Sequence, residues 1–246
     1  MNKMSFTIIF ARWCLRTAVL ITCVCLYFLE PAVLDSFWQF RPSDGFGLQM
    51  VVWILLMVEV IYLFVPRLNR EVGVGKLFQA NYHAPDKPYD ESKMFKVVKQ
   101  LNQGMTRMLL VWFFFAAMVG LLFHSGVIGF RGLLIWTAVY YFTDITFVIF
   151  FCPFQVFIMK NSCCVNCRIY GYGPFFIFTP LVFMNNFFSW TLFGVSTLFL
   201  LVWELQAAYH PERFSKTSNA ALQCQNCEQK LCRVKRKLKI EKHFGN

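Results

Sequence analysis

Residues 174–205 read PFFIFTPLVFMNNFFSWTLFGVSTLFLLVWEL, and this apolar block decides the topology of the chain. One straight helix of that length would reach about 48 Å, whereas the hydrocarbon core of a bilayer is about 30 Å thick. Asn185 and Asn186 lie inside the block, and asparagine favours turns. We therefore expect a hairpin with two membrane legs. Pro180 kinks the first leg, and because that leg is short, a re-entrant leg is the alternative.

The composition of the whole chain is that of an integral membrane protein. Of its 246 residues, 57% are hydrophobic and only 15% are charged, whereas soluble domains carry about 25% charge. Apolar runs predict further spans at about residues 18–34, 46–65, 108–123 and 132–151. The sequence thus predicts an all-α integral membrane protein with about six crossings. Arg12 and Arg16 are expected just before the first span, in a segment at the interface.

The placement of charge predicts the orientation. The chain has 24 Lys and Arg, 13 Asp and Glu and a net charge of +11. With six crossings, the outer loops hold only Arg41 and Arg131, which leaves 22 of the 24 cations on the other side or at its boundary. Because cytoplasmic loops are rich in Lys and Arg, we expect both termini in the cytoplasm and the protein in the cell membrane.

Two basic segments lie outside the predicted spans. The membrane domain is expected over 1–210 and includes a cytoplasmic loop at 67–107, in which residues 91–103 form an amphipathic surface helix. A basic tail follows at 211–246. Both segments favour contact with anionic inner-leaflet lipids. Nucleic-acid binding is disfavoured, because no aromatic–basic recognition motif accompanies the tail.

Two Cys-x-x-Cys pairs flank the hairpin. The first lies in a knuckle at 160–170, and the second lies in the tail. A hairpin returns the chain to the side that it left, so both pairs are expected on the cytoplasmic face. Two such pairs can supply the four thiolates of a closed, tetrahedral zinc-ribbon-like site. The predicted zinc ligands are Cys164, Cys167, Cys224 and Cys227.

Other states of these cysteines stay open. Four cysteines can also hold an iron–sulfur cluster, although the clustered ferredoxin run is absent. Unligated thiols and disulfides are further alternatives, and disulfides are disfavoured on a reducing side of the membrane. Cys163 could replace Cys164 as a ligand, and Cys232 is one more candidate. A spare thiolate would suit redox or metal-transfer chemistry.

Two acids, Glu59 and Asp144, lie inside predicted spans at a similar depth. A charged carboxylate at the centre of a span costs about 2.5–3.5 kcal/mol on insertion scales. Together with Tyr141, Asp144 forms part of a polar stripe on its helix. The pair is either a proton or cation site, or a set of carboxyl groups that join helices. The joining role is favoured, because the spans contain no obvious base.

The sequence predicts an architecture more firmly than an activity. The first hypothesis is a membrane scaffold, adaptor or regulatory platform in which zinc joins the tail to the cytoplasmic loop and a protein partner binds there. The alternatives are a membrane redox module with an iron–sulfur cluster or reactive dithiols, and an ion or proton-coupled transporter that uses Glu59 and Asp144. An enzyme is not favoured, because no Ser-His-Asp arrangement, zincin helix or dinucleotide fingerprint occurs in the sequence.

Overall fold

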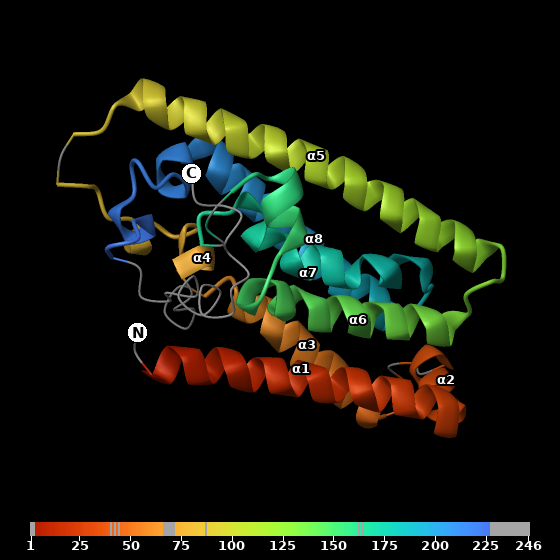
Figure 1. Ribbon diagram of the computed structural model, residues 1–246. Helices are drawn as coiled ribbons and strands as arrows, with labels where there is room; N and C mark the ends of the chain where they lie inside the picture. Colours follow the sequence, from red (N-terminus) through yellow and green to blue (C-terminus); the bar gives the residue numbers. More distant parts are fainter. Residues whose placement is uncertain are drawn as a thin grey trace.

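The fold is built from helices. The computed structural model describes residues 3–39, 41, 43, 45–65, 72–86, 88–161, 163 and 165–226, and these residues contain no β-strand. The long helices lie side by side along one direction (Figure 1). The α-helices are α1 (Lys3–Leu29), α2 (Pro31–Gln39), α3 (Leu48–Tyr62), α4 (Val72–Gly75), α5 (Glu91–His124), α6 (Phe130–Ile149), α7 (Gly173–Phe178) and α8 (Phe187–Tyr209). The short 3₁₀ or π segments are η2 (Gln79–Asn81), η3 (Phe154–Ile158), η4 (Arg168–Tyr172), η5 (Thr179–Phe183), η6 (Pro211–Phe214) and η7 (Ala220–Leu222).

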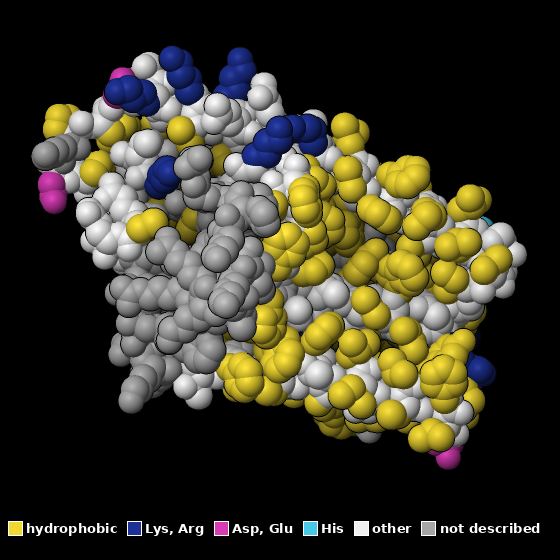
Figure 2. Space-filling view, viewed as in Figure 1, with side chains coloured by type: hydrophobic (Ala, Val, Ile, Leu, Met, Phe, Trp, Pro, Cys, Tyr) yellow, Lys and Arg dark blue, Asp and Glu magenta, His cyan; other side chains and the backbone are white. Residues whose placement is uncertain are grey.

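The helices have the length and surface of a membrane protein. Within the described residues, four are long and apolar enough to cross a membrane: Thr7–Leu29 of α1, α5, α6 and α8. Helix α3 is apolar but has only 15 residues. Apolar side chains cover much of the surface, whereas Lys and Arg gather near the start of α5 (Figure 2). Such a broad exposed apolar surface is typical of lipid-facing proteins.

Helix α1 begins earlier than the sequence predicts. It is continuous from Lys3 to Leu29, so the segment expected at the interface is part of the helix. The helix ends where Pro31 follows, because the residue before a proline avoids the α conformation. Pro31 then occupies the first position of α2, where its missing N–H has no partner to lose. As a result, Arg12 and Arg16 lie inside a candidate span.

Helix α5 joins two elements that the sequence separates. The predicted surface helix at 91–103 and the predicted span at 108–123 form one helix of 34 residues, which is about 51 Å long. Its start is capped by Asp90, whose carboxylate accepts from the backbone N–H groups of the first turn. No proline interrupts it, and Gly104 allows close contact with Met159. The helix exceeds the thickness of a bilayer core, so its basic first turns extend beyond one.

The last apolar block forms the expected turn, but its first leg is irregular. The leg consists of α7 and η5, which together rise about 19 Å. Asn186 caps α8 by accepting from the backbone N–H of Ser189 at 2.8 Å. The leg is buried between α5, α6 and α8. It therefore supplies the centre of the bundle, where the indole N–H of Trp112 donates to Thr179 Oγ1 at 3.2 Å.

One end of the bundle is closed by a layer that we call the polar cap, made of residues 72–83, 165–172 and 211–226. Its parts are distant in sequence and are joined by hydrogen bonds, such as that from the backbone N–H of Ala220 to His83 O at 2.7 Å. The cap buries an unusual number of polar side chains: Lys76, Asn166, Arg168, Arg213, Ser215, Ser218 and Asn219. Figure 1 shows α4 and the last described segment together at this end.

Candidate functional site

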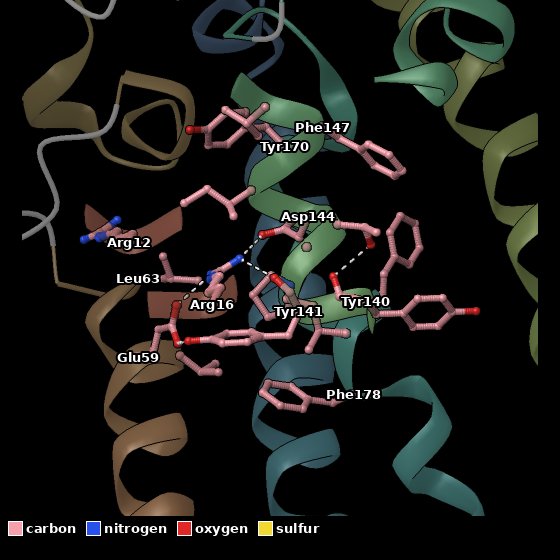
Figure 3. Close-up of a pocket in the computed structure, with 18 of the residues that line it drawn as sticks. Arg12, Arg16, Glu59, Leu63, Tyr140, Tyr141, Asp144, Phe147, Tyr170 and Phe178 are labelled. Carbon is pink, nitrogen blue, oxygen red and sulfur yellow. Dashed lines mark hydrogen bonds and ion pairs between the residues drawn. The ribbon is translucent and has the colours of Figure 1, made fainter. Parts of the chain in front are cut away.

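A cluster of charged side chains lies among three helices of the bundle. Arg16 of α1 contacts Glu59 of α3 through Nη2 and Oε1 at 2.7 Å. The same guanidinium contacts Asp144 of α6 through Nη1 and Oδ2 at 2.8 Å. Figure 3 shows Arg16 between the two carboxylates. The two predicted intramembrane acids therefore share one arginine.

Tyr141 completes the cluster. Its hydroxyl donates to Glu59 Oε2 at 2.7 Å, and its backbone oxygen accepts from Arg16 Nη1 at 3.0 Å. The guanidinium carbon also lies 4.1 Å from the centre of the Tyr141 ring, a favourable cation–π distance. Arg16 thus has partners on every side, and its side chain is only 11% exposed.

The packing of α1 against α6 positions Arg16. One turn before it, the indole N–H of Trp13 donates to Thr146 Oγ1 at 3.1 Å, which fixes the register of the two helices. Trp13 also stacks on Phe10 and meets the edge of Phe150. With the register fixed, the Arg16 side chain points toward α3 and α6. The contact between α1 and α6 is therefore polar at Arg16 and apolar around it.

The cluster lines a cavity of about 580 Å³ between α1, α3, α6 and α7. The carboxylates are more accessible than the arginine, since the side chains of Glu59 and Asp144 are 40% and 36% exposed. Beside Asp144, a Cβ atom on Gly173 would lie 2.8 Å from Oδ1, so glycine leaves space for this carboxylate. The other titratable residues that line the cavity are Arg12, Tyr62, Tyr140, Cys152, Cys167 and Tyr170.

The cluster carries more negative than positive charge. One guanidinium faces two carboxylates, which makes the ionised group negative by one charge. The other cation in the lining, Arg12, lies near the Tyr62 ring, with 6.0 Å between its guanidinium carbon and the ring centre. In Figure 3 the Arg12 head group is directed away from Glu59 and Asp144. An excess carboxylate in an apolar bundle is costly unless a proton or another cation joins it.

Sequence reasoning missed Arg16, because it placed this residue before the first span. Arg12 and Arg16 are four residues apart and so share a helical face. That spacing, within an apolar helix, is the signal that could have identified an intramembrane base. Thr137, one turn before Tyr141 on α6, donates its hydroxyl proton to the backbone oxygen of Leu133 at 2.9 Å and not to the cluster.

The structure describes only some of the predicted metal ligands. Cys167 is buried and Cys163 is half-buried, whereas Cys224 is exposed. Cys164, Cys227 and the extra candidate Cys232 lie outside the described residues. Within the part that is described, no three His, Cys, Asp or Glu side chains form a metal-binding group. The zinc site therefore stays a prediction, as does the iron–sulfur alternative.

A buried lysine holds the first cysteine knuckle. Lys76 Nζ donates to the backbone oxygens of Val165 at 2.7 Å and Cys167 at 3.1 Å. It also lies 5.4 Å from the centre of the Trp203 ring. Burial lowers the pKa of Lys76 to about 7, while the nearby Cys167 acts in the opposite direction. The knuckle is therefore held by a buried lysine whose partners the sequence did not predict.

A second ion group fixes the polar cap to the membrane helices. Arg168 Nη2 lies 2.8 Å from Glu204 Oε2 of α8, and Arg168 Nε donates to Asn102 Oδ1 of α5 at 3.2 Å. The hydroxyl of Tyr172 donates to Glu204 Oε1 at 2.6 Å. Burial raises the pKa of Tyr172, and the Glu204 carboxylate raises it further. Glu204 therefore joins the cap to the bundle.

The described part of the tail is also held by protein contacts. Arg213 donates to Gln206 Oε1 at 3.1 Å, and a second bond joins it to Gln79. The side chain of Asn219 donates to the backbone oxygen of Arg213 at 3.0 Å and is almost fully buried. These bonds hold residues 211–226 against the loop at 72–83. From the sequence alone, we expected a metal ion to be the main constraint on this segment. Its buried polar contacts could not be predicted, because the partner residues are distant in sequence.

Comparison with family models, with curated proteins and with solved structures finds no match. The fold and the site define a class: a helical membrane protein with an arginine–carboxylate cluster in a cavity of its bundle.

Proposed function

We propose that this protein is a proton-coupled membrane transporter in which Glu59 and Asp144 bind the coupling proton. The observation that carries this proposal is the position of Arg16 between the two carboxylates in the cavity wall. The sequence alone offered two acids without a base. The cluster supplies a cationic partner, Arg16, and also leaves one carboxylate in excess.

The chemistry of the cluster supports exchange of a cation. Intramembrane carboxylates that pair with a base are typical of proton and ion pathways. Arg16 stays charged because arginine does not lose its proton in proteins. With Arg16 charged, the cluster is neutral when one of the two carboxylates carries a proton. Loss of that proton into the cavity leaves a negative charge that a second cation can neutralise.

We also propose six crossings, in which α3 and the leg made of α7 and η5 accompany the four longer helices. The indole N–H of Trp53 on α3 donates to Thr191 Oγ1 on α8 at 3.0 Å, which places α3 within the bundle. The leg packs between α5, α6 and α8. Six crossings agree with the distribution of cations and place both termini in the cytoplasm. Reporter fusions at residue 246 and after Leu34 should give opposite signals, and matching signals would rule out this topology.

Proton uptake by reconstituted vesicles tests the transport function. Vesicles that contain the protein and a trapped pH dye should acidify inside when a potassium gradient with valinomycin makes the lumen negative. Asp144→Asn and Glu59→Gln should each slow the acidification at least about tenfold, on the scale of lost proton transfer by a positioned group. Glu91→Gln changes an exposed acid in the first turn of α5 and is the matched control.

Two results would contradict the transport function. One is a parent protein that acidifies the vesicles no faster than empty vesicles do. The other is equal rates for the parent and both cluster variants. The Asp144→Asn protein should fold normally, because Arg16 and Glu59 still form a neutral pair.

A second candidate function is the zinc-held scaffold, and the position of Lys76 favours it. Lys76 Nζ donates to the backbone oxygens of Val165 and Cys167 within the first cysteine knuckle. Zinc with four thiolates has a formal charge of −2, which a nearby ammonium offsets. In this proposal Cys164, Cys167, Cys224 and Cys227 bind zinc, and the polar cap binds a protein partner.

Metal analysis of anaerobically purified protein tests the scaffold. One zinc per chain, lost in Cys224→Ser, is the expected result. Brown protein with about two or four irons per chain would establish the redox alternative instead. Protein with neither metal would remove both.

The exposed start of α5 is a proposed contact for anionic lipid. Lys93, Lys96 and Lys99 are all exposed there. Each cation near an anionic leaflet contributes about 1 kcal/mol. A variant with all three changed to glutamine should copurify with less phosphatidylserine than the parent, and equal amounts would contradict this contact.

A further inference from the structure

We propose that the cavity binds an organic ammonium ion, with the charged group beside Asp144 and the apolar part against the aromatic walls. This inference rests on the proposed function, because it names the class of substrate that the transport cavity takes.

Asp144 has one carboxylate oxygen to offer. Its Oδ2 accepts from Arg16 at 2.8 Å, whereas its Oδ1 has no donor among the described residues of the protein. Gly173 lies against Oδ1, and even a methyl group there would come within 2.8 Å. In contrast, both oxygens of Glu59 are used, one by Arg16 and one by Tyr141. Asp144 is thus the carboxylate that can receive a ligand.

Aromatic rings form part of the cavity walls, together with aliphatic side chains. The rings that line the cavity include Trp112, Phe147, Phe154, Tyr170, Phe176 and Phe178. The faces of aromatic rings attract cations, and quaternary ammonium groups are commonly recognised in this way. The volume of about 580 Å³ lies within the usual range for small-molecule sites. An ammonium ion with an apolar body matches both the walls and the size.

The balance of charge favours a cation over an anion. Arg16 is already shared by two carboxylates and is only 11% exposed, so it has little capacity for an anionic ligand. Asp144 is 36% exposed. Arg12 lies near Tyr62 and is directed away from the cluster (Figure 3). A ligand at Asp144 therefore meets net negative charge.

Calorimetric titration of the full-length protein in detergent at pH 7.5 tests this inference. The probes are benzyltrimethylammonium, its neutral isostere neopentylbenzene and the anion phenylacetate, each titrated also into empty micelles. The ammonium ion should bind, and the other two should not. Asp144→Asn should weaken binding by about 10- to 100-fold, which is the effect of losing a partner to a charged group.

A second variant separates binding from folding. Gly173→Ala keeps the Asp144 carboxylate but places a methyl group against Oδ1. The helical backbone at this position, with φ −47° and ψ −57°, accepts alanine. This variant should weaken binding of the ammonium ion at least about tenfold, on the scale of one lost charged contact. The exposed control Glu91→Gln should bind as the parent does.

Each other result overturns the inference. These results are equal binding of the neutral isostere, preference for phenylacetate, and absence of ammonium binding. Unchanged binding of the ammonium ion in both Asp144→Asn and Gly173→Ala would also overturn it. If vesicle acidification still depends on Asp144 while the ammonium ion does not bind, the ligand class is wrong and the transport function remains. If the ammonium ion binds but the vesicles do not acidify, the ligand site is supported and the transport function fails.

Discussion

Replacing Arg16 with methionine tests whether the arginine stabilises the bundle. Methionine keeps an unbranched side chain but removes the contacts at 2.7 Å and 2.8 Å to the two carboxylates. Removing one partner of a buried ion pair costs about 3–5 kcal/mol, because the remaining charge is unpaired. The carboxylates are 40% and 36% exposed, so water screens them in part. We therefore expect a loss of about 3 kcal/mol in the free energy of unfolding at neutral pH.

The assay is unfolding by dodecyl sulfate in mixed micelles, followed by circular dichroism and tryptophan fluorescence. A triple variant, Arg16→Met with Glu59→Gln and Asp144→Asn, carries no charge in the cluster and should unfold within about 1 kcal/mol of the parent. Arg107→Met, at an exposed position of α5, should change stability by less than about 0.5 kcal/mol. A triple variant as unstable as Arg16→Met, or a single variant as stable as the parent, would refute the reasoning.

Three further predictions concern other parts of the molecule. In the same unfolding assay, Gly171→Ala should cost about 1–3 kcal/mol because its Cβ would lie 2.2 Å from a buried tryptophan ring, whereas Gly194→Ala, with open space around it, should be neutral or stabilising. Lys76→Met removes both bonds to the cysteine knuckle, so the buried thiol of Cys167 should react faster with iodoacetamide, as peptide mass spectrometry would show. The pKa of Asp35 is lowered by its hydrogen bond to Arg131 of α6. The ionised carboxylate therefore stabilises the fold above about pH 4, and this stabilisation is lost as the pH falls below that value. Asp35→Asn should therefore make stability less dependent on pH in that acidic range.

The sequence predicted the helical class and the turn of the last hairpin for physical reasons that act locally. Long apolar runs must be helical in lipid, and Asn186 caps the helix that follows it. The boundaries of α1 and α5 were less accurate, because a helix can continue through polar residues when nothing breaks it. Hydropathy alone does not predict that α1 continues through Arg16 or that α5 continues through Gly104.

The candidate site was harder to predict, because its partners are distant in sequence. Glu59 and Asp144 were identified as acids in lipid, but Arg16 gains its role only from packing against α3 and α6. No role was predicted for Lys76 from the sequence. Its carbonyl partners come from a knuckle about ninety residues away. Burial of single basic residues depends on tertiary contacts that one sequence does not encode in any local pattern.

The position of Arg16 also affects how the chain enters the membrane during synthesis. The first helix carries this arginine near its middle, where an unpaired guanidinium costs about 2.5–3.5 kcal/mol on insertion scales. Its two carboxylate partners are made 43 and 128 residues later. The nascent first helix therefore carries an unpaired charge until Glu59 emerges, and Asp144 later adds the second carboxylate. Release of this helix from the insertion machinery into lipid is thus expected to become more favourable once Glu59 has been translated.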